Sequence, residues 1–243
     1  MNKCLVAFSC PIIISSRRRT TMLKSYMNSI PPCPEKYIRI SRSFETLLYD
    51  IVNLLHFSEY FSEKEFSDEY VKYRVISGLY SSYRSSILNT VLLLECGSNC
   101  LIDSLKFGSD LQKEIDKMTV LTKYEVFLKE VNSAASFDRG CKEVQSVKEL
   151  VGLRNTLAHS KPKKEEYYRE QDTGYYFLKV GKKNITKIPL QPEHWNLDHA
   201  ITAILSICNF YNLYLIEWCR LDIDRIKELL FSSYETCAKK SNY

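Results

Sequence analysis

Residues 149–164 combine a helical apolar pattern with side chains that could handle phosphate. The stretch reads ELVGLRNTLAHSKPKK. Apolar residues recur in it at the spacing of a core-facing helix stripe, at Leu150, Leu153 and Leu157. On such a helix Arg154 stands at the edge of the stripe, while Asn155 and His159 lie one turn apart on the adjoining face. The spacing therefore allows a groove bordered by a guanidinium and an imidazole.

An arginine and a histidine in one groove suit phosphoryl transfer without a metal ion. The planar fork of Arg154 can neutralise phosphate oxygens and stabilise charge that grows in the transition state. The imidazole of His159 can take a proton from a ribose 2′-hydroxyl or give one to the leaving 5′-oxygen. One histidine cannot easily do both, so two copies of the motif facing each other across a two-fold axis could share the work. Three lysines follow and could hold neighbouring phosphates: Lys161, Lys163 and Lys164.

The same residues also suit an ordinary helix end. Cations near the C-terminus of a helix interact favourably with its dipole, by about 0.3–1 kcal/mol each. An arginine followed by a histidine five positions later therefore has a structural explanation as well as a chemical one.

Composition describes a folded, mostly helical chain whose positive charge is concentrated in two places. Of the 243 residues, 45% are hydrophobic and 26% charged, and only seven Gly and seven Pro are present. The formal net charge is +5, but residues 1–40 carry +6 and residues 159–190 carry +4. Such concentration is what a polyanion-binding surface needs, although a solvated loop has the same pattern. We expect a basic, poorly ordered tail over residues 1–40 and one helical domain over residues 41–243.

The nine cysteines favour a reducing compartment over a disulfide framework. Their number is odd, they are scattered, and most lie inside apolar helical patterns. Cys96 and Cys100 are one helical turn apart, but no second pair follows at zinc-ligand spacing, so neither a metal site nor a cofactor is expected. The apolar start is interrupted by Pro11 and lacks a small-residue cleavage site, which argues against a secretion signal. We therefore expect the protein to be cytoplasmic.

Periodicity predicts at least five helices and one short insertion. A helix begins near Ser43, and a long run over about 69–106 reads as one helix or two end to end. A capping box of Ser109 and Gln112 opens an amphipathic helix that continues to about 132, and the motif helix follows. Residues 174–190 alternate and have a turn at 181–184, which predicts a small β-hairpin within an insertion at about 165–192. The last part of the chain reads as one or two helices.

Two apolar segments carry polar residues that need explanation. Glu95 lies within the apolar half of the long helix, where a carboxylate must be paired or functional because burying it alone is costly. The run over 200–218 is apolar nearly all round but contains Asn209, Asn212 and Glu217. Three polar groups would carry a heavy penalty in lipid, so a buried or interface helix is predicted and no membrane association.

The insertion has two interpretations. Its lysines and tyrosines could track an RNA backbone and stack bases, or they could belong to a solvated hairpin whose aromatics pack on the domain. These residues are Lys179, Lys182, Lys183, Lys187, Tyr167, Tyr168, Tyr175 and Tyr176.

The motif resembles the R-x4–6-H signature of the HEPN superfamily, with Arg154, a polar Asn155 directly after it, and then His159. The resemblance covers about residues 70–220 and implies an all-α bundle of four to five helices, here with the hairpin insertion at about 165–192. It also implies a homodimer in which two motif helices meet. Many members are metal-independent endoribonucleases that serve as toxins or antiviral effectors, while others have lost catalysis.

The resemblance assigns roles to particular residues. Arg154, Asn155 and His159 would be catalytic, and cleavage would leave a 2′,3′-cyclic phosphate. RNA would also contact Glu95 and the lysines after the motif: Lys161, Lys163 and Lys164. Members paired with a nucleotidyltransferase antitoxin carry a modifiable tyrosine two residues after the histidine, where this chain has Lys161. A partner from an antitoxin or defence system is expected. The alternatives are a non-catalytic module that binds RNA or a partner protein, and a purely structural helical bundle.

Overall fold

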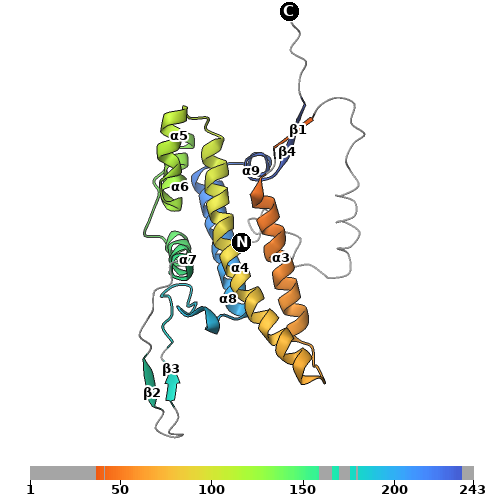
Figure 1. The fold of residues 1–243 in the computed structure, drawn as a ribbon. Coiled ribbons are helices and arrows are strands. Elements are labelled where there is room, and N and C mark those ends of the chain that lie inside the picture. Colours follow the sequence, from red (N-terminus) through yellow and green to blue (C-terminus); the bar gives the residue numbers. More distant parts are fainter. Residues whose placement is uncertain (1–36, 41, 159–165, 170–175, 179, 237–243) are drawn as a thin grey trace, which may run out of the picture.

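Helices make up most of the chain in the computed structural model, which describes residues 37–40, 42–158, 166–169, 176–178 and 180–236 (Figure 1). The prediction of a mostly helical protein is therefore confirmed. The helices are α3 (Ser43–Ser62), α4 (Glu69–Asp103), α5 (Ser109–Asp116), α6 (Val120–Val131), α7 (Lys142–Ala158), the 3-10 turn η2 (Pro192–His194), α8 (Leu197–Tyr211), the π-helical segment η3 (Asn212–Trp218) and α9 (Ile223–Leu230).

Helix α4 is the central element, and α3, α6, α7, α8 and α9 all contact it. It forms an antiparallel pair with α3 and runs the length of the molecule (Figure 1). The side chain of Asp68 starts it by accepting hydrogen bonds from the backbone N–H groups of Tyr70 and Val71, at 2.8 and 3.0 Å. The long periodic run is therefore one uninterrupted helix.

The single amphipathic helix predicted over 109–132 is wrong, because this segment forms two helices. Helix α5 ends at Asp116, and α6 begins at Val120. Thr119 is the N-cap of α6, and its hydroxyl accepts a hydrogen bond from the Thr122 N–H at 3.4 Å. The predicted capping box is absent, since Gly108 is the N-cap of α5 and has no side chain to contribute. A second helix therefore begins after the Thr119 cap.

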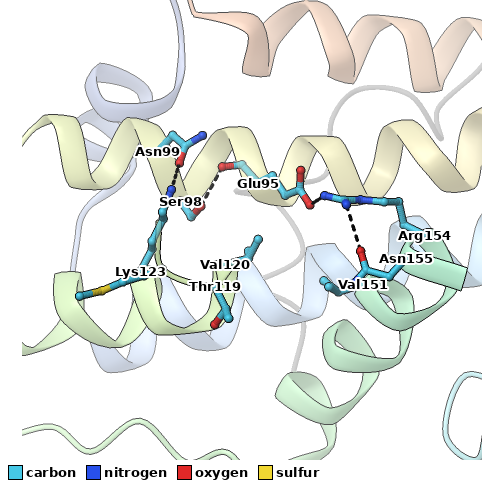
Figure 2. A pocket seen from close by; sticks show the side chains of 10 residues that line it. Glu95, Ser98, Asn99, Thr119, Val120, Lys123, Val151, Arg154 and Asn155 are labelled. Atoms are coloured by element: carbon cyan, nitrogen blue, oxygen red, sulfur yellow. Dashed lines mark hydrogen bonds and ion pairs between the residues drawn. The ribbon is translucent and has the colours of Figure 1, made fainter. Parts of the chain in front are cut away.

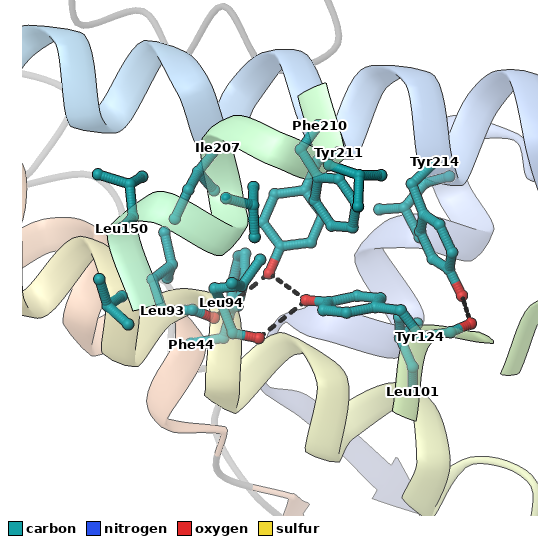
Figure 3. Close-up of a cluster of buried hydrophobic side chains, with 14 of the residues drawn as sticks. Phe44, Leu93, Leu94, Leu101, Tyr124, Leu150, Ile207, Phe210, Tyr211 and Tyr214 are labelled. Carbon is teal, nitrogen blue, oxygen red and sulfur yellow. Dashed lines mark hydrogen bonds between the residues drawn. The ribbon is translucent and has the colours of Figure 1, made fainter. Parts of the chain in front are cut away.

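Tyrosines and aliphatic side chains fill the core between α4, α6, α7 and α8 (Figure 3). The Tyr124 hydroxyl donates to the Leu94 carbonyl at 2.8 Å and lies 2.9 Å from the Tyr211 hydroxyl. Burial raises the pKa values of both tyrosines, so they stay neutral donors. Gly97 lets these rings approach α4, because a β-carbon there would lie 3.0 Å from the Tyr124 oxygen and closer still to the Tyr211 oxygen.

Short strands lie at the two ends of the described residues and after α7. Strand β1 (Tyr37–Ile40) pairs antiparallel with β4 (Ser233–Thr236), so the predicted boundary at residue 40 falls at the end of a strand. Residues 1–36 of the predicted tail lie outside the described residues. Strand β2 (Tyr167–Arg169) pairs antiparallel with β3 (Tyr176–Leu178). The chain reverses again after β3, where the Lys183 N–H donates to the Ile188 carbonyl at 2.9 Å.

Two described helical stretches, α4 and the continuous α8–η3 stretch, could cross a membrane by length and composition alone. Within the fold, 56% of the most apolar part of α4 and 44% of that of α8–η3 are buried. Ala203, Ile207 and Phe210 of α8 face the core, whereas Ile201 and Leu205 are exposed. Helix α8 therefore packs as a core helix and leaves one apolar side uncovered.

Candidate functional site

Arg154 lies in the last described turn of α7 and reaches toward α4 (Figure 2). Its guanidinium forms an ion pair with the Glu95 carboxylate and donates through Nη1 to the Asn155 side-chain oxygen at 2.9 Å. The two paired side chains are 28% and 22% exposed. The guanidinium Nε is buried and has no hydrogen-bond partner among the described residues. Glu95 and Asn155 therefore hold the Arg154 guanidinium in one orientation.

The ion pair explains the carboxylate that the sequence placed in an apolar helix. Glu95 and Arg154 are 59 residues apart, and the packing of α7 on α4 brings them together. A partly buried pair such as this one is costly to break from one side, because the remaining charge loses its partner in a poorly solvated place. Glu95 thus fixes the direction of the arginine fork.

A pocket of about 370 Å³ opens beside this ion pair (Figure 2). It lies between α4, the start of α6 and α7. Two cations and one carboxylate line it, so the charge of its walls is net positive. The lining residues are Glu95, Ser98, Asn99, Met118, Thr119, Val120, Lys123, Val151, Arg154 and Asn155.

Lys123 is a pocket residue that the sequence analysis missed. Its side chain is only 8% exposed, and its ammonium donates to the Asn99 side-chain oxygen at 2.7 Å (Figure 2). No carboxylate pairs with Lys123 in the part of the chain that the structure describes. The available signal was the position of this lysine within the buried stripe of α6, next to Tyr124 and opposite the solvent-facing residues.

The remaining predicted site residues stand after the described part of α7. His159, Lys161, Lys163 and Lys164 lie outside the described residues, so their positions relative to Arg154 stay predictions. Asn155 is exposed at the rim of the pocket and holds the Arg154 guanidinium. The structure therefore joins Arg154, Asn155 and Glu95.

Hydrogen bonds to Glu149 connect the segment after β3 to helix α7. Its carboxylate accepts hydrogen bonds from the backbone N–H groups of Asn184, Ile185 and Thr186 at 2.9–3.2 Å, and from the Thr186 hydroxyl at 3.0 Å. A β-carbon on Gly152 would lie 3.2 Å from Lys183 Nζ, so that lysine rests against α7. Of the other insertion lysines, Lys182 and Lys187 are exposed, and Lys179 lies outside the described residues.

Glu149 is expected to make the stability of the fold depend on pH. Burial alone would raise the pKa of Glu149, but the hydrogen bonds from Thr186, Ile185 and Asn184 outweigh it and hold the pKa below its ordinary value. The contribution of the carboxylate is therefore complete above the unfolded pKa of about 4.3 and is lost as the pH falls through the folded value.

The Glu149→Gln variant is expected to lower the free energy of unfolding by about 1–2 kcal/mol at neutral pH, because a neutral amide oxygen accepts more weakly than a carboxylate. The difference from wild type should narrow as the pH falls below the unfolded pKa of about 4.3. Urea unfolding followed by circular dichroism over this range would measure it. Glu130→Gln, at an exposed position of α6, is the control. A difference that does not change with pH would contradict the role assigned to Glu149.

The described residues hold no group of three or more His, Cys, Asp or Glu side chains that could bind a metal ion. Cys96 and Cys100 form one neighbouring thiol pair on α4, where the hydrogen bond with Cys100 lowers the pKa of Cys96 to about 7. A two-ligand cluster of this kind lacks the further ligands of a structural zinc site.

Comparison with known proteins adds no relative: no family model, curated protein or solved structure matches the chain.

Proposed function

We propose that the protein is a metal-independent endoribonuclease of HEPN type that acts as a homodimer through α7, with the pocket beside Arg154 as half of its active site. The observation that carries the proposal is the Arg154 guanidinium, which Glu95 and Asn155 hold at the rim of an open pocket. An arginine oriented at the edge of a pocket is a group that can bind the oxygens of a phosphodiester.

In this mechanism a base removes the proton from a ribose 2′-hydroxyl, and the 2′-oxygen attacks the adjacent phosphorus. The bond to the 5′-oxygen breaks, that oxygen receives a proton, and a 2′,3′-cyclic phosphate remains. His159 of one protomer would take the first proton and His159 of its partner would supply the second. Arg154 would bind the non-bridging oxygens and stabilise their growing charge, while Glu95 keeps its fork in position.

Dimerisation places the proposed active site at the exposed side of α7. Asn155 and Ala158 are exposed in the last turn of this helix, next to the pocket. A small alanine there permits the close approach of a second copy, and a two-fold axis is the most common symmetry of oligomers. A toxin or antiviral role and an antitoxin or defence partner rest on the HEPN resemblance alone, whereas a cytoplasmic location rests on the pattern of cysteines.

The decisive experiment compares purified wild type with His159→Ala on total cellular RNA in the presence of EDTA. Wild type is expected to cleave and to leave cyclic-phosphate ends, whereas the variant should leave RNA intact while keeping its fold and its RNA affinity. His194→Ala is a suitable control, because His194 is exposed at η2 and lies on another element.

Intact RNA with wild type would favour the second candidate, a non-catalytic HEPN module. Such a module should bind RNA with an affinity that falls steeply with salt and with removal of the 161–187 lysines. In that case Arg154 and His159 would be dimer or ligand contacts. The Glu95–Arg154 pair supports this alternative, because the Glu95 carboxylate already neutralises the charge of the Arg154 guanidinium within the protein.

A further inference from the structure

Lys123 is a buried cation that forms no ion pair with a carboxylate among the described residues. Its side chain is 8% exposed, and its ammonium hydrogen-bonds to the neutral side chain of Asn99. A charged group removed from water is costly unless it is paired. Because Lys123 lines the pocket, an anion in that pocket can supply the missing pairing.

The start of α6 strengthens the same end of the pocket. Thr119 and Val120, the N-cap and first residue of this 12-residue helix, both line the cavity. Backbone N–H groups and the positive end of the helix dipole favour an anion at such a position. The buried ammonium of Lys123, one turn further along α6, adds a full positive charge.

The two cationic ends of the pocket are anchored one turn apart on α4. Arg154 pairs with Glu95, and Lys123 bonds to the residue four positions later, Asn99 (Figure 2). One turn of helix rises about 5.4 Å. The two phosphorus atoms of a diphosphate share a bridging oxygen and are much closer together than this, whereas successive phosphates of RNA are separated by a ribose.

We infer that Lys123, Asn99 and the N-terminus of α6 form a second phosphate subsite, which holds the RNA phosphate next to the one bound by Arg154. This inference rests on the proposed function, since it extends the same pocket by one nucleotide. The apolar side chains of Val120 and Val151 line the pocket between the two ends and can contact the ribose between the phosphates. The ligand class is a nucleoside that carries phosphates on both its 3′ and 5′ oxygens.

Calorimetric titration of the full chain with three nucleotides tests the subsite without requiring cleavage. The probes are adenosine 3′,5′-bisphosphate, adenosine 5′-monophosphate and adenosine diphosphate, at one fixed salt concentration. Wild type is expected to bind the 3′,5′-bisphosphate at least about tenfold more tightly than the monophosphate, because a second phosphate adds charge-assisted hydrogen bonds. Adenosine diphosphate should bind more weakly than the bisphosphate.

Two variants remove the subsite in different ways. Lys123→Met keeps the buried stem and deletes the charge, and Asn99→Asp keeps the shape but gives Lys123 an internal counter-ion. Both are expected to bind the bisphosphate no more tightly than the monophosphate. Lys129→Met, at an exposed position of the same helix, should behave as wild type. Asn99→Asp keeps the test decisive if Lys123→Met does not fold, since it supplies the partner that the buried lysine lacks.

A preference for the bisphosphate that survives in Asn99→Asp would overturn the subsite, as would equal affinities of wild type for the bisphosphate and the monophosphate. Tighter binding of adenosine diphosphate would overturn the assignment to RNA. The failure of the proposed function is separate. Wild type that leaves RNA intact but shows a Lys123-dependent preference for the bisphosphate supports the subsite without the nuclease.

Discussion

Replacing Arg154 by alanine is expected to reduce the rate of RNA cleavage by between about a hundredfold and a thousandfold. This is the typical loss when one donor that stabilises transition-state charge is removed. The loss should appear in kcat more than in KM, because the guanidinium interacts most strongly with the charge that develops during the reaction. Single-turnover cleavage of a short RNA would measure it, with Lys148→Ala, an exposed position of α7, as the control.

The Glu95–Arg154 pair makes it necessary to separate catalysis from stability. Arg154→Ala leaves Glu95 without its partner in a partly buried place, so the variant should also lose stability. Replacing both residues by alanine removes the unpaired charge and should restore much of that stability. Cleavage should stay low in the double variant. If cleavage returned together with stability, Arg154 would have a structural role only.

Gly97→Ala is expected to cause the largest loss of stability of any small change in the core. The added methyl group would meet the hydroxyl groups of Tyr211 and Tyr124, both fully buried between α4, α6 and α8. Moving the Tyr124 ring breaks its hydrogen bond to the Leu94 carbonyl, and moving either ring breaks the hydrogen bond between the two hydroxyl groups. We expect a loss of about 3 kcal/mol, the upper part of the range for overpacking, and a fall in melting temperature of roughly 6–12 °C.

Gly78→Ala is the matched control for this prediction. Gly78 lies on the same helix, and the nearest atom to a β-carbon there is 3.9 Å away, on the Phe57 ring. Alanine should therefore stabilise α4 at this position, by about 0.5–1 kcal/mol. Combining Gly97→Ala with Tyr211→Phe should recover part of the loss, since the nearest clashing atom is removed. Equal effects at the two glycines would show that helix propensity, and not close packing, determines the change in stability.

The mostly helical character could be read from periodicity, and so could the long helix α4. Its apolar residues recur over 69–103 without proline, and this local pattern is sufficient to specify a helix. The split between α5 and α6 could not be read in this way, because the amphipathic pattern continues across it. Thr119 and Ser109 are both possible N-cap residues by type. Only the packing of α6 on α4 selects Thr119 as the cap that starts a helix.

For the site, the sequence alone determined that Arg154 and Asn155 lie near the end of an amphipathic helix, because the apolar residues before them recur at helical spacing. It also required that Glu95 have a partner, since an isolated carboxylate is unstable in an apolar surrounding. Only the tertiary structure showed that this partner is Arg154. Helices α4 and α7 pack together by burying apolar surface, and because this interaction is non-directional, the sequence does not show which helices will pack together. The same packing placed Lys123 beside Asn99 and left a pocket between two cations, an arrangement that depends on three helices meeting.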